Sequence, residues 1–376
     1  MSRGEIYRRL GVEPIINANA TETILGGSLL RPEVVEAMAQ AADSFVDLVE
    51  LEERVGERLA SLTRNEAAFV CGGAASALFL TAVACMTRDV EDGILRLEDL
   101  ASFPREFILH PGHLVPYVSA IQLAGGVLIE AGSTDGTSQD DLEDALTDRT
   151  AGILVVAGAH VAAGTLPLAT VIAVGRAHSI PVIVDAAAQI PPVSSLWEFS
   201  AAGADFTILS GGKGLRGPAS TGIIVGPGPG IRRCAANAAP LHRVGRPMKV
   251  GKEDLIGILT AVELALADDE AATIEGYEQD VRHVIDWGNA RADIDVVREV
   301  PSEAGQPMPR ARITLRGATA ARRDEVIADL RDGRPRVSVR PAGGDGIYIN
   351  PQTLLDGEVE IVCRRLSEIL DAGPRT

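Results

Sequence analysis

Lys213 is the residue whose type and surroundings most directly indicate chemistry. It lies in the glycine-rich stretch Ser210-Gly-Gly-Lys213-Gly, directly after an apolar run. Only three of the 35 basic residues are lysines, so arginine is used almost wherever a positive charge suffices. A lysine amine can bond to an aldehyde as a Schiff base, whereas arginine stays protonated. The other two lysines, Lys249 and Lys252, suit ordinary surface positions equally well.

The Ser-x-x-Lys spacing of residues 210–213 also occurs in serine acyl-transfer enzymes, where the serine is the nucleophile and the lysine its base. In those enzymes the motif begins a helix, but here Gly211 and Gly212 fill it. Glycines allow the backbone to approach a flat ring closely. A Schiff-base lysine is therefore preferred, with serine acyl transfer as an alternative.

Asp185 ends the apolar run Val182-Ile-Val-Asp185, where a solvent-facing charge is not expected. A buried carboxylate requires a partner. A protonated pyridine nitrogen is one such partner, and the pairing keeps the ring able to draw electrons from a substrate carbanion. A helix N-cap or a metal ligand would also suit an aspartate at a strand end.

A second glycine-rich turn, Cys71-Gly-Gly-Ala-Ala-Ser76, joins an expected strand to an expected helix. The first amides of a helix lack internal acceptors and lie at the positive end of its dipole, so such a turn can bind phosphate. The candidate phosphate-binding residues are Gly73, Ala74, Ala75 and Ser76. Such turns are common, but the order along the chain supports the assignment: phosphate turn, strand-end aspartate, then lysine.

His113, in His110-Pro-Gly-His113, also follows an expected strand and could stack its imidazole on a cofactor ring. Ligands of open α/β sheets collect beyond the carboxyl ends of the strands. His113 lies further beyond this strand end than His110, so we prefer it. His110 and a purely structural histidine are the alternatives.

The elements that position these residues alternate between short apolar strands and helices, which is typical of a mostly parallel sheet covered on both faces. The expected strands are 66–70, 107–110, 127–130, 152–156, 182–185, 206–210 and 222–225, and the expected helical segments are 31–64 and 77–86. Beyond a turn at 226–230 the pattern predicts helix over 251–290, strands at 310–315, 337–340 and 346–349, and helices at 320–330 and 357–370.

These segments predict an N-terminal arm (1–30), a large α/β domain (31–255) and a small α+β C-terminal domain (256–376). The net charge of −17 disfavours nonspecific binding to nucleic acid or anionic membranes. No apolar run reaches the roughly 18 residues of a membrane helix and no signal-peptide pattern is present, so a cytoplasmic protein is expected. The four cysteines have no spacing for zinc or a disulfide framework, and no metal is expected.

With these motifs the chain resembles the fold-type I pyridoxal-phosphate enzymes, in the branch of bacterial L-seryl-tRNA(Sec) selenium transferase and D-glucosaminate-6-phosphate ammonia-lyase. The resemblance covers most of the chain. It rests on Ile16-Asn-Ala-Asn19-Ala-Thr21 with Leu25-Gly-Gly-Ser28, Val182-Ile-Val-Asp185-Ala-Ala-Ala-Gln189-Ile-Pro-Pro192, Ser210-Gly-Gly-Lys213-Gly-Leu-Arg-Gly-Pro218-Ala-Ser-Thr221-Gly, Val244-Gly-Arg246-Pro-Met-Lys249-Val-Gly-Lys252-Glu and Ile349-Asn-Pro351-Gln-Thr-Leu-Leu-Asp-Gly-Glu358.

The resemblance implies an aminotransferase-like fold with a large sheet of the seven-stranded type, pyridoxal 5'-phosphate as cofactor, and a homodimer or higher homo-oligomer with shared active sites. By matching position, Lys213 would form the Schiff base and Asp185 would pair with the pyridine nitrogen. Ala187 and His113 would pack on the ring.

The same matching assigns the phosphate to Ser76 with its neighbouring amides. Ser210 is a second phosphate candidate, and Ser220 would reach the phosphate of the adjacent subunit. Many relatives in the wider fold carry Gln or His three residues beyond the aspartate to bind the phenolic oxygen, where this chain has Ala188. The role of the following Gln189 is therefore open.

The expected reaction is α,β-elimination (ammonia-lyase or dehydratase) or β-replacement through a Cα carbanion, on a small amino acid or amino sugar acid. Lys213 would be the base at Cα. The expected substrate-binding residues are Asn19, Thr21, Arg246 and Arg340, of which the arginines can grip a carboxylate or phosphate through paired hydrogen bonds.

Aldolase, racemase and aminotransferase reactions are alternatives within the cofactor class, because they differ only in the bond that breaks at Cα or Cβ. A catalytically silent binding protein of this fold is an alternative outside it. A selenium transferase would carry an extra N-terminal tRNA-binding region and a more basic surface, so a small-molecule enzyme without a nucleic-acid partner is preferred.

Overall fold

The computed structural model describes residues 4–374. They form two compact units. The larger unit contains Leu29–Asp268 together with Glu303–Gly305, and the smaller one contains 4–28, Asp269–Ser302 and 306–374. The predicted boundary at residue 255 lies inside helix α10 (Lys252–Ala267). The three-part division into arm, large domain and small domain stays a prediction.

A seven-stranded sheet runs through the larger unit. Its spatial order is β2 (Ala67–Cys71), β8 (Gly222–Gly226), β7 (Phe206–Ser210), β6 (Val182–Asp185), β5 (Thr150–Val156), β3 (Glu106–Leu109) and β4 (Val127–Glu130). Neighbours are parallel except around β8, which runs antiparallel to both β2 and β7. The carboxyl ends of β3 to β7 therefore share one edge, which is where ligands of such sheets bind.

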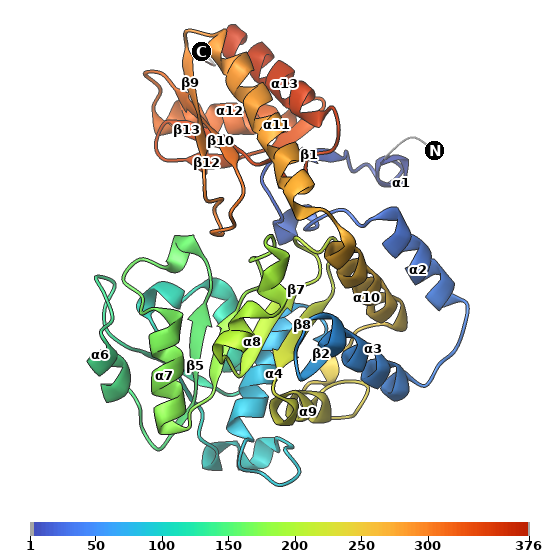
Figure 1. The fold of residues 1–376 in the computed structure, drawn as a ribbon. Helices are drawn as coiled ribbons and strands as arrows, with labels where there is room; N and C mark the ends of the chain where they lie inside the picture. The colour runs from blue at the N-terminus through green and yellow to red at the C-terminus, as the bar shows by residue number, and fades with distance from the viewer. Residues whose placement is uncertain (1–3, 375–376) are drawn as a thin grey trace. The chain divides into compact units, whose positions relative to one another are not determined.

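Helices cover both faces of this sheet (Figure 1). One core contains residues of α3 (Leu48–Leu62), α7 (Leu168–His178) and α10, and the other contains residues of α4 (Ala74–Met86), α5 (Ser119–Leu123) and α9 (Gly228–Asn237). Strand β6 contributes Val182 and Val184 to the first core and Ile183 to the second. Both faces are apolar, which explains the continuous hydrophobic run that precedes Asp185.

The segment predicted as largely helical over 31–64 consists of two helices, α2 (Pro32–Ala42) and α3. They are separated because the Asp47 carboxylate accepts hydrogen bonds from the amides of Val49 and Glu50 and caps α3. The remaining helices of the larger unit are α6 (Gln139–Asp144) and α8 (Glu198–Ala202).

The smaller unit has an antiparallel sheet in the order β12 (Arg340–Ala342), β13 (Gly346–Ile349), β10 (Arg310–Leu315) and β9 (Ile294–Glu299). Its apolar face packs against α11 (Glu270–Asn289), α12 (Ala320–Asp332) and α13 (Glu358–Ala372). Near the N-terminus lie α1 (Glu5–Arg8) and β1 (Ile15–Asn17), and β1 pairs in parallel with β11 (Arg336–Ser338). Neither β1 nor β9 was predicted from the sequence.

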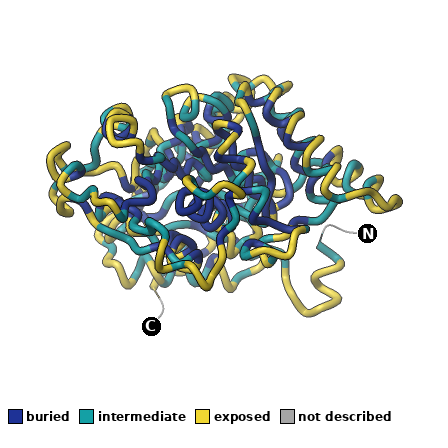
Figure 2. Tube along the Cα trace, turned by 90° about the horizontal axis from the view of Figure 1, so that it is seen from below, coloured by how far each residue is buried: buried dark blue, intermediate teal, exposed yellow. Residues whose placement is uncertain are grey.

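Buried and exposed stretches alternate along the chain as the elements pass between interior and surface (Figure 2). The helix α4 is buried from Ser76 to its last residue, because the sheet lies on one side of it and α5 and α9 pack against it as well. Within residues 4–374, no helix is both long and apolar enough to cross a membrane.

Candidate active site

Asp185 ends β6 in the middle of the sheet, where β5 and β7 flank it. The residue is only 4% exposed, and its Oδ1 accepts a hydrogen bond from the Ala187 amide at 3.0 Å. Burial raises the pKa of Asp185 above its ordinary value, while the Ala187 amide and the charge of Lys213 oppose this shift. A carboxylate in this setting is stabilised by a cationic hydrogen-bond donor.

Lys213 lies in a closed loop between β7 and β8. The Gly211 amide donates to the Thr221 carbonyl at 2.9 Å, and the Gly217 amide donates to the Gly211 carbonyl at 2.8 Å. A Cβ on Gly214 would overlap the Ile190 carbonyl, so the loop is packed against the chain that follows Asp185. The glycines are therefore required by space, and they fix the backbone from which Lys213 projects.

The amine of Lys213 and the carboxylate of Asp185 interact electrostatically, so the structure brings these two predicted residues together. Burial lowers the pKa of Lys213, and the carboxylates of Asp185 and Glu303 partly restore it. A lowered pKa leaves more of the amine unprotonated at neutral pH, and only the unprotonated amine is nucleophilic.

The turn between β2 and α4 presents backbone amides at its helical end. Gly73 has a φ of 99°, a conformation that favours glycine. The hydroxyl of Ser76 donates to the Gly72 carbonyl at 2.8 Å. Within the described chain, the amides of Ala74, Ala75 and Ser76 have no hydrogen-bond acceptor. Three such amides at the start of a long helix can bind an anion such as phosphate.

The lysine loop and this turn are in direct contact. Gly222, the first residue of β8, pairs with Cys71 on one side and Ser210 on the other. A Cβ on Gly222 would overlap the Gly73 carbonyl and lie 2.8 Å from the Ala74 nitrogen. Ser210 therefore shares a row of the sheet with the residue that precedes the phosphate turn.

The histidines lie on the short helix η3 (Pro111–His113) and just before it, after β3. Their ring centroids are 5.7 Å apart, and the Gly112 amide donates to His110 Nδ1 at 2.8 Å. Burial, aided by His110, lowers the pKa of His113 to about 4, so the ring is neutral at pH 7. Within residues 4–374, His113 Nδ1 and His110 Nε2 are buried without a hydrogen-bond partner.

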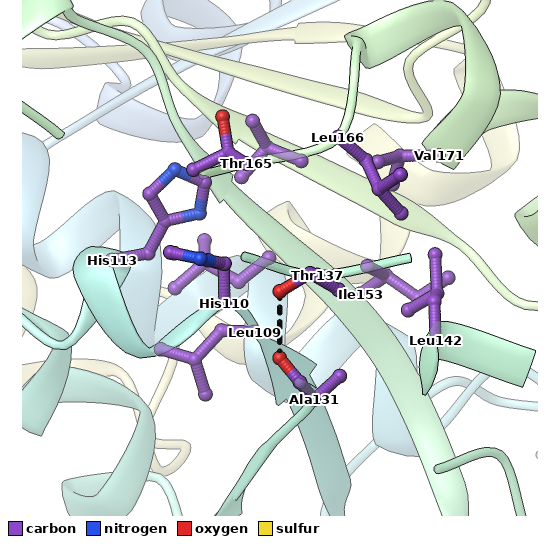
Figure 3. A pocket seen from close by; sticks show the side chains of 12 residues that line it. Leu109, His110, His113, Ala131, Thr137, Leu142, Ile153, Thr165, Leu166 and Val171 are labelled. Carbon is purple, nitrogen blue, oxygen red and sulfur yellow. Dashed lines mark hydrogen bonds between the residues drawn. The ribbon is translucent and has the colours of Figure 1, made fainter. Parts of the chain in front are cut away.

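A cavity of about 30 Å³ lies next to these rings. The two histidines lie at one end of it, and Leu142 and Val171 lie at the other (Figure 3). The Thr137 hydroxyl donates a hydrogen bond to the Ala131 carbonyl at 2.9 Å (Figure 3). The volume suits one ordered water rather than a pyridine ring. Neither Asp185 nor Lys213 lines this cavity.

The other predicted cofactor residues have varied surroundings. Ala187 is half-buried and supplies the amide bonded to Asp185. Ser220 is exposed, and its hydroxyl donates to Asp254 at 2.8 Å. Arg246 begins the short helix η7 (Arg246–Met248), and the Met248 carbonyl accepts a hydrogen bond from the Gly72 amide at 3.0 Å. Arg246 is thus two residues from a direct contact with the phosphate turn.

In the smaller unit, Asn19 and Arg340 meet at Glu22. Asn19 Nδ2 donates to one carboxylate oxygen of Glu22 at 3.2 Å, and the Arg340 guanidinium lies 2.9 Å from the other. Thr21 is half-buried beside them in the chain. The Asn19 Oδ1 atom is buried without a partner among the described residues. Asn19, Arg340 and Glu22 therefore form one cluster, and Glu22 is the member that sequence reasoning missed.

Three further residues near Asp185 and Lys213 were also missed. Burial and the charge of Asp185 raise the pKa of Tyr117 to about 12, so its phenol lies near that carboxylate. Gln189 Nε2 donates to the carbonyls of Ala157 and Ala304, each at 2.9 Å. The negative charge of Glu303 favours the protonated form of Lys213 and so raises its pKa. Gln189 lies in a motif already noted and Tyr117 follows His113 by four residues, but nothing in the local sequence signals Glu303.

Known proteins resemble this chain closely. Residues 15–274 match the family model described as SelA: L-seryl-tRNA selenium transferase. A 5'-C-glycyluridine monooxygenase-decarboxylase of a Streptomyces species is 33% identical, over 97% of this chain and 92% of that protein. The D-glucosaminate-6-phosphate ammonia lyase of Salmonella typhimurium is 31% identical, over 97% of this chain and 98% of that protein.

A solved structure of D-glucosaminate-6-phosphate ammonia-lyase superposes with a TM-score of 0.85 at 30% identity, covering 99% of both chains. A NifS-like protein superposes with a TM-score of 0.62 at 15% identity, over 96% of this chain and all of that one, and this likeness shows the fold alone. The aminotransferase-like α/β fold and the family resemblance predicted from the motifs are confirmed. The chain therefore belongs to the L-seryl-tRNA selenium transferase family and is an enzyme of the fold-type I pyridoxal-phosphate group.

Proposed function

We propose that this enzyme is a pyridoxal-phosphate-dependent lyase that removes a β-hydroxyl group and ammonia from a small amino acid or amino sugar acid. The observation that carries the proposal is the full-length relationship to an ammonia lyase: 31% identity over 97% of the chain, and a TM-score of 0.85 to a solved ammonia-lyase structure. An oligosaccharide or tRNA substrate is not needed to account for any described residue.

The residues present fit the cofactor. The buried Asp185, whose pKa is raised, suits a protonated pyridine nitrogen. The acceptor-free amides of Ala74, Ala75 and Ser76 suit the phosphate. Lys213, with its lowered pKa, suits the aldehyde carbon. We propose that Ser210 contributes to the phosphate site, and that Ser220 does so across a subunit boundary.

When bound, pyridoxal phosphate supplies an electron sink for the Cα–H bond of the substrate amine. With substrate bound, the free amine of Lys213 would act as the base that takes the proton from Cα. The resulting ammonium of Lys213 can pass a proton to the hydroxyl that departs from Cβ. The released enamine is hydrolysed to a 2-keto acid and ammonia. Asp185 would hold its charge at the ring nitrogen, and the neutral His113 would pack against the ring.

We propose that substrate anions are bound by Arg246 and Arg340, with Asn19 and Thr21 contributing hydrogen bonds. The guanidinium of Arg340 already pairs with the Glu22 carboxylate at 2.9 Å, which supports a role in holding acidic groups. A homodimer or higher homo-oligomer with shared sites, without nucleic acid, is part of the proposal. So is a cytoplasmic location, supported by the four cysteines, which are all buried free thiols.

A second candidate reaction is oxidative decarboxylation, favoured by the 33% identity to the Streptomyces monooxygenase-decarboxylase. The two candidates differ in their products. Elimination yields ammonia and a 2-keto acid without oxygen. Oxidative decarboxylation yields carbon dioxide and consumes oxygen.

The test begins with the purified protein and pyridoxal phosphate. Wild type should develop the visible absorbance of a lysine-bound cofactor, and Lys213→Ala should not. Lys249→Ala is the matched control, because Lys249 is an exposed lysine outside the loop. Candidate β-hydroxy amino acids and amino sugar acids are then assayed for ammonia and keto acid. Aldehyde plus glycine, or carbon dioxide with oxygen uptake, would contradict elimination.

A further inference from the structure

A tripeptide from the C-terminal half of the chain belongs to the larger unit. Glu303–Gly305 is flanked on both sides by segments of the smaller unit. A Cβ on Gly305 would lie 2.7 Å from the Ala159 nitrogen, and a Cβ on Gly158 would lie 3.2 Å from the Ala304 carbonyl oxygen. The tripeptide therefore packs on the turn that follows β5, at the same sheet edge as Asp185.

Gln189 holds this tripeptide. Its side-chain amide donates to the Ala304 carbonyl and to the Ala157 carbonyl, each at 2.9 Å. The Ala157 amide in turn donates to the Asp185 carbonyl at 2.9 Å. One side chain thus links the tripeptide to the backbone that carries Asp185. Because its amide nitrogen is engaged in this way, Gln189 acts here as a structural tie.

We propose that Glu303 is a positioning residue for Lys213: held at the sheet edge by Gln189, its carboxylate orients the lysine amine and stabilises its protonated form. This inference rests on the proposed function, because it concerns the proton that Lys213 takes from Cα. It assigns a role to a residue on a segment that is distant in sequence from every cofactor motif.

The charges around Lys213 explain why a second carboxylate matters. Both Asp185 and Glu303 favour the protonated amine. In the proposed reaction Asp185 would pair with the ring nitrogen. Of the two carboxylates, Glu303 would then be the one that stabilises the protonated amine of Lys213. A base next to a carboxylate is stronger, because the positive charge that it gains is stabilised.

Other ionisable groups lie near this site, but their electrostatic interactions are with Asp185 or His113 rather than with Lys213. Tyr117 interacts with Asp185, and His110 and His160 interact with His113. The ring of His160 also lies against Gly158, in the turn on which the tripeptide packs. For this reason the test follows the protonation of the lysine-bound cofactor itself rather than a rate that several groups could influence.

The experiment titrates the visible absorbance of the holoenzyme with pH in wild type and Glu303→Gln. Loss of the carboxylate should move the midpoint of the titration to lower pH by about one unit, the usual effect of removing one nearby opposite charge. Glu130→Gln is the control, because Glu130 is an exposed carboxylate at the end of β4 on the same sheet edge. Its midpoint should equal that of wild type.

Gln189→Leu tests the tie. It keeps the size of the side chain but removes the amide donors, so its midpoint should shift in the same direction as that of Glu303→Gln. Adding Glu303→Gln to Gln189→Leu should then shift it little further. Amide hydrogen exchange at residues 303–305 should also become faster. If Glu303→Gln misfolds, Glu303→Ala, which also removes the carboxylate, and Gln189→Leu supply the same measurement.

An unchanged midpoint, or a shift to higher pH, in a folded Glu303→Gln protein with full cofactor content overturns the inference. Independent shifts that simply add in the double variant refute the role of Gln189. If wild type itself shows no visible band that depends on Lys213, the proposed function has failed instead. The two failures are therefore distinguishable.

Discussion

Gly222 of β8 lies directly against Gly73 of the turn before α4, so closely that a Cβ on Gly222 would overlap the Gly73 carbonyl. This contact joins the loop that carries Lys213 to the turn proposed to bind phosphate. The two halves of the proposed cofactor site are thus held in register by a contact between residues without side chains.

Gly222→Ala should therefore weaken cofactor binding. The added methyl group must displace the turn, and with it the amide of Ala74 at 2.8 Å. We expect an affinity for pyridoxal phosphate lower by at least about tenfold, or ~1.4 kcal/mol, measured by absorbance titration of the apoprotein. Gly276→Ala in α11, where a Cβ meets nothing within 4 Å, is the control and should bind normally.

Asp185→Asn should raise the thermal stability of the apoprotein and lower the activity of the holoenzyme. Burial raises the pKa of Asp185, so the folded state favours the protonated carboxyl over the carboxylate. The stability that this group contributes is therefore present at low pH and is lost as pH rises through the folded pKa. The neutral amide still accepts from Ala187. We expect the apoprotein to melt about 2 °C higher than wild type, and the holoenzyme to lose activity by at least about 100-fold. A variant that melts lower and keeps its activity would contradict the assignment.

His113 should make the free energy of unfolding depend measurably on pH. Its pKa is lowered from 6.5 to about 4 in the fold, so the unfolded chain binds a proton in this range that the folded chain does not. Stability from this group is present above pH 6.5 and is lost as pH falls towards 4, with a slope of up to about 1.4 kcal/mol per pH unit.

Urea unfolding of His113→Gln between pH 6.5 and 4 should accordingly show a flatter pH profile than wild type. His178→Gln provides the comparison, because His178 is exposed at the end of α7. Its profile should follow that of wild type. Equal slopes in all three proteins would show that the His113 ring is not held neutral by burial.

Arg340→Ala should raise KM for the substrate by about tenfold or more, if the side chain binds a substrate anion as proposed. Its stability should change by less than about 1 kcal/mol, because the pair with Glu22 is partly exposed. Arg316→Ala, which removes another exposed ion pair from the same unit, should leave both quantities unchanged within error. A KM equal to that of wild type would exclude Arg340 from substrate binding.

The cofactor-binding strands were largely predictable from sequence because their signals are local. The run 182–185 was predicted within the limits of β6, and 206–210 within those of β7. Both strands are buried on two faces, so all residues before Asp185 in β6 and all but Thr207 before Ser210 in β7 are apolar. The break at Asp47 was missed, because the apolar period of α2 continues into α3 and only a capping side chain interrupts it.

Contacts across the fold were not predictable in the same way. Glu22 joins Asn19 to Arg340, and Gln189 joins Ala157 to Ala304, through pairs that are far apart in sequence. A glutamine or glutamate carries no periodic signal of its own, so its partner becomes known only once the chain is folded. The same holds for strand β1, whose three residues are stabilised as a strand by pairing with β11.

The tripeptide Glu303–Gly305 has a practical consequence for dissecting the protein. A fragment that ends at Asp268 would contain the whole seven-stranded sheet and Lys213, and by length alone it would qualify as an expressible domain. It would nevertheless lack the Ala304 carbonyl that the Gln189 amide donates to. It would also lack the residues that pack on the turn after β5. The larger unit is therefore discontinuous along the chain, and a truncation or domain exchange that preserves it must include these three residues.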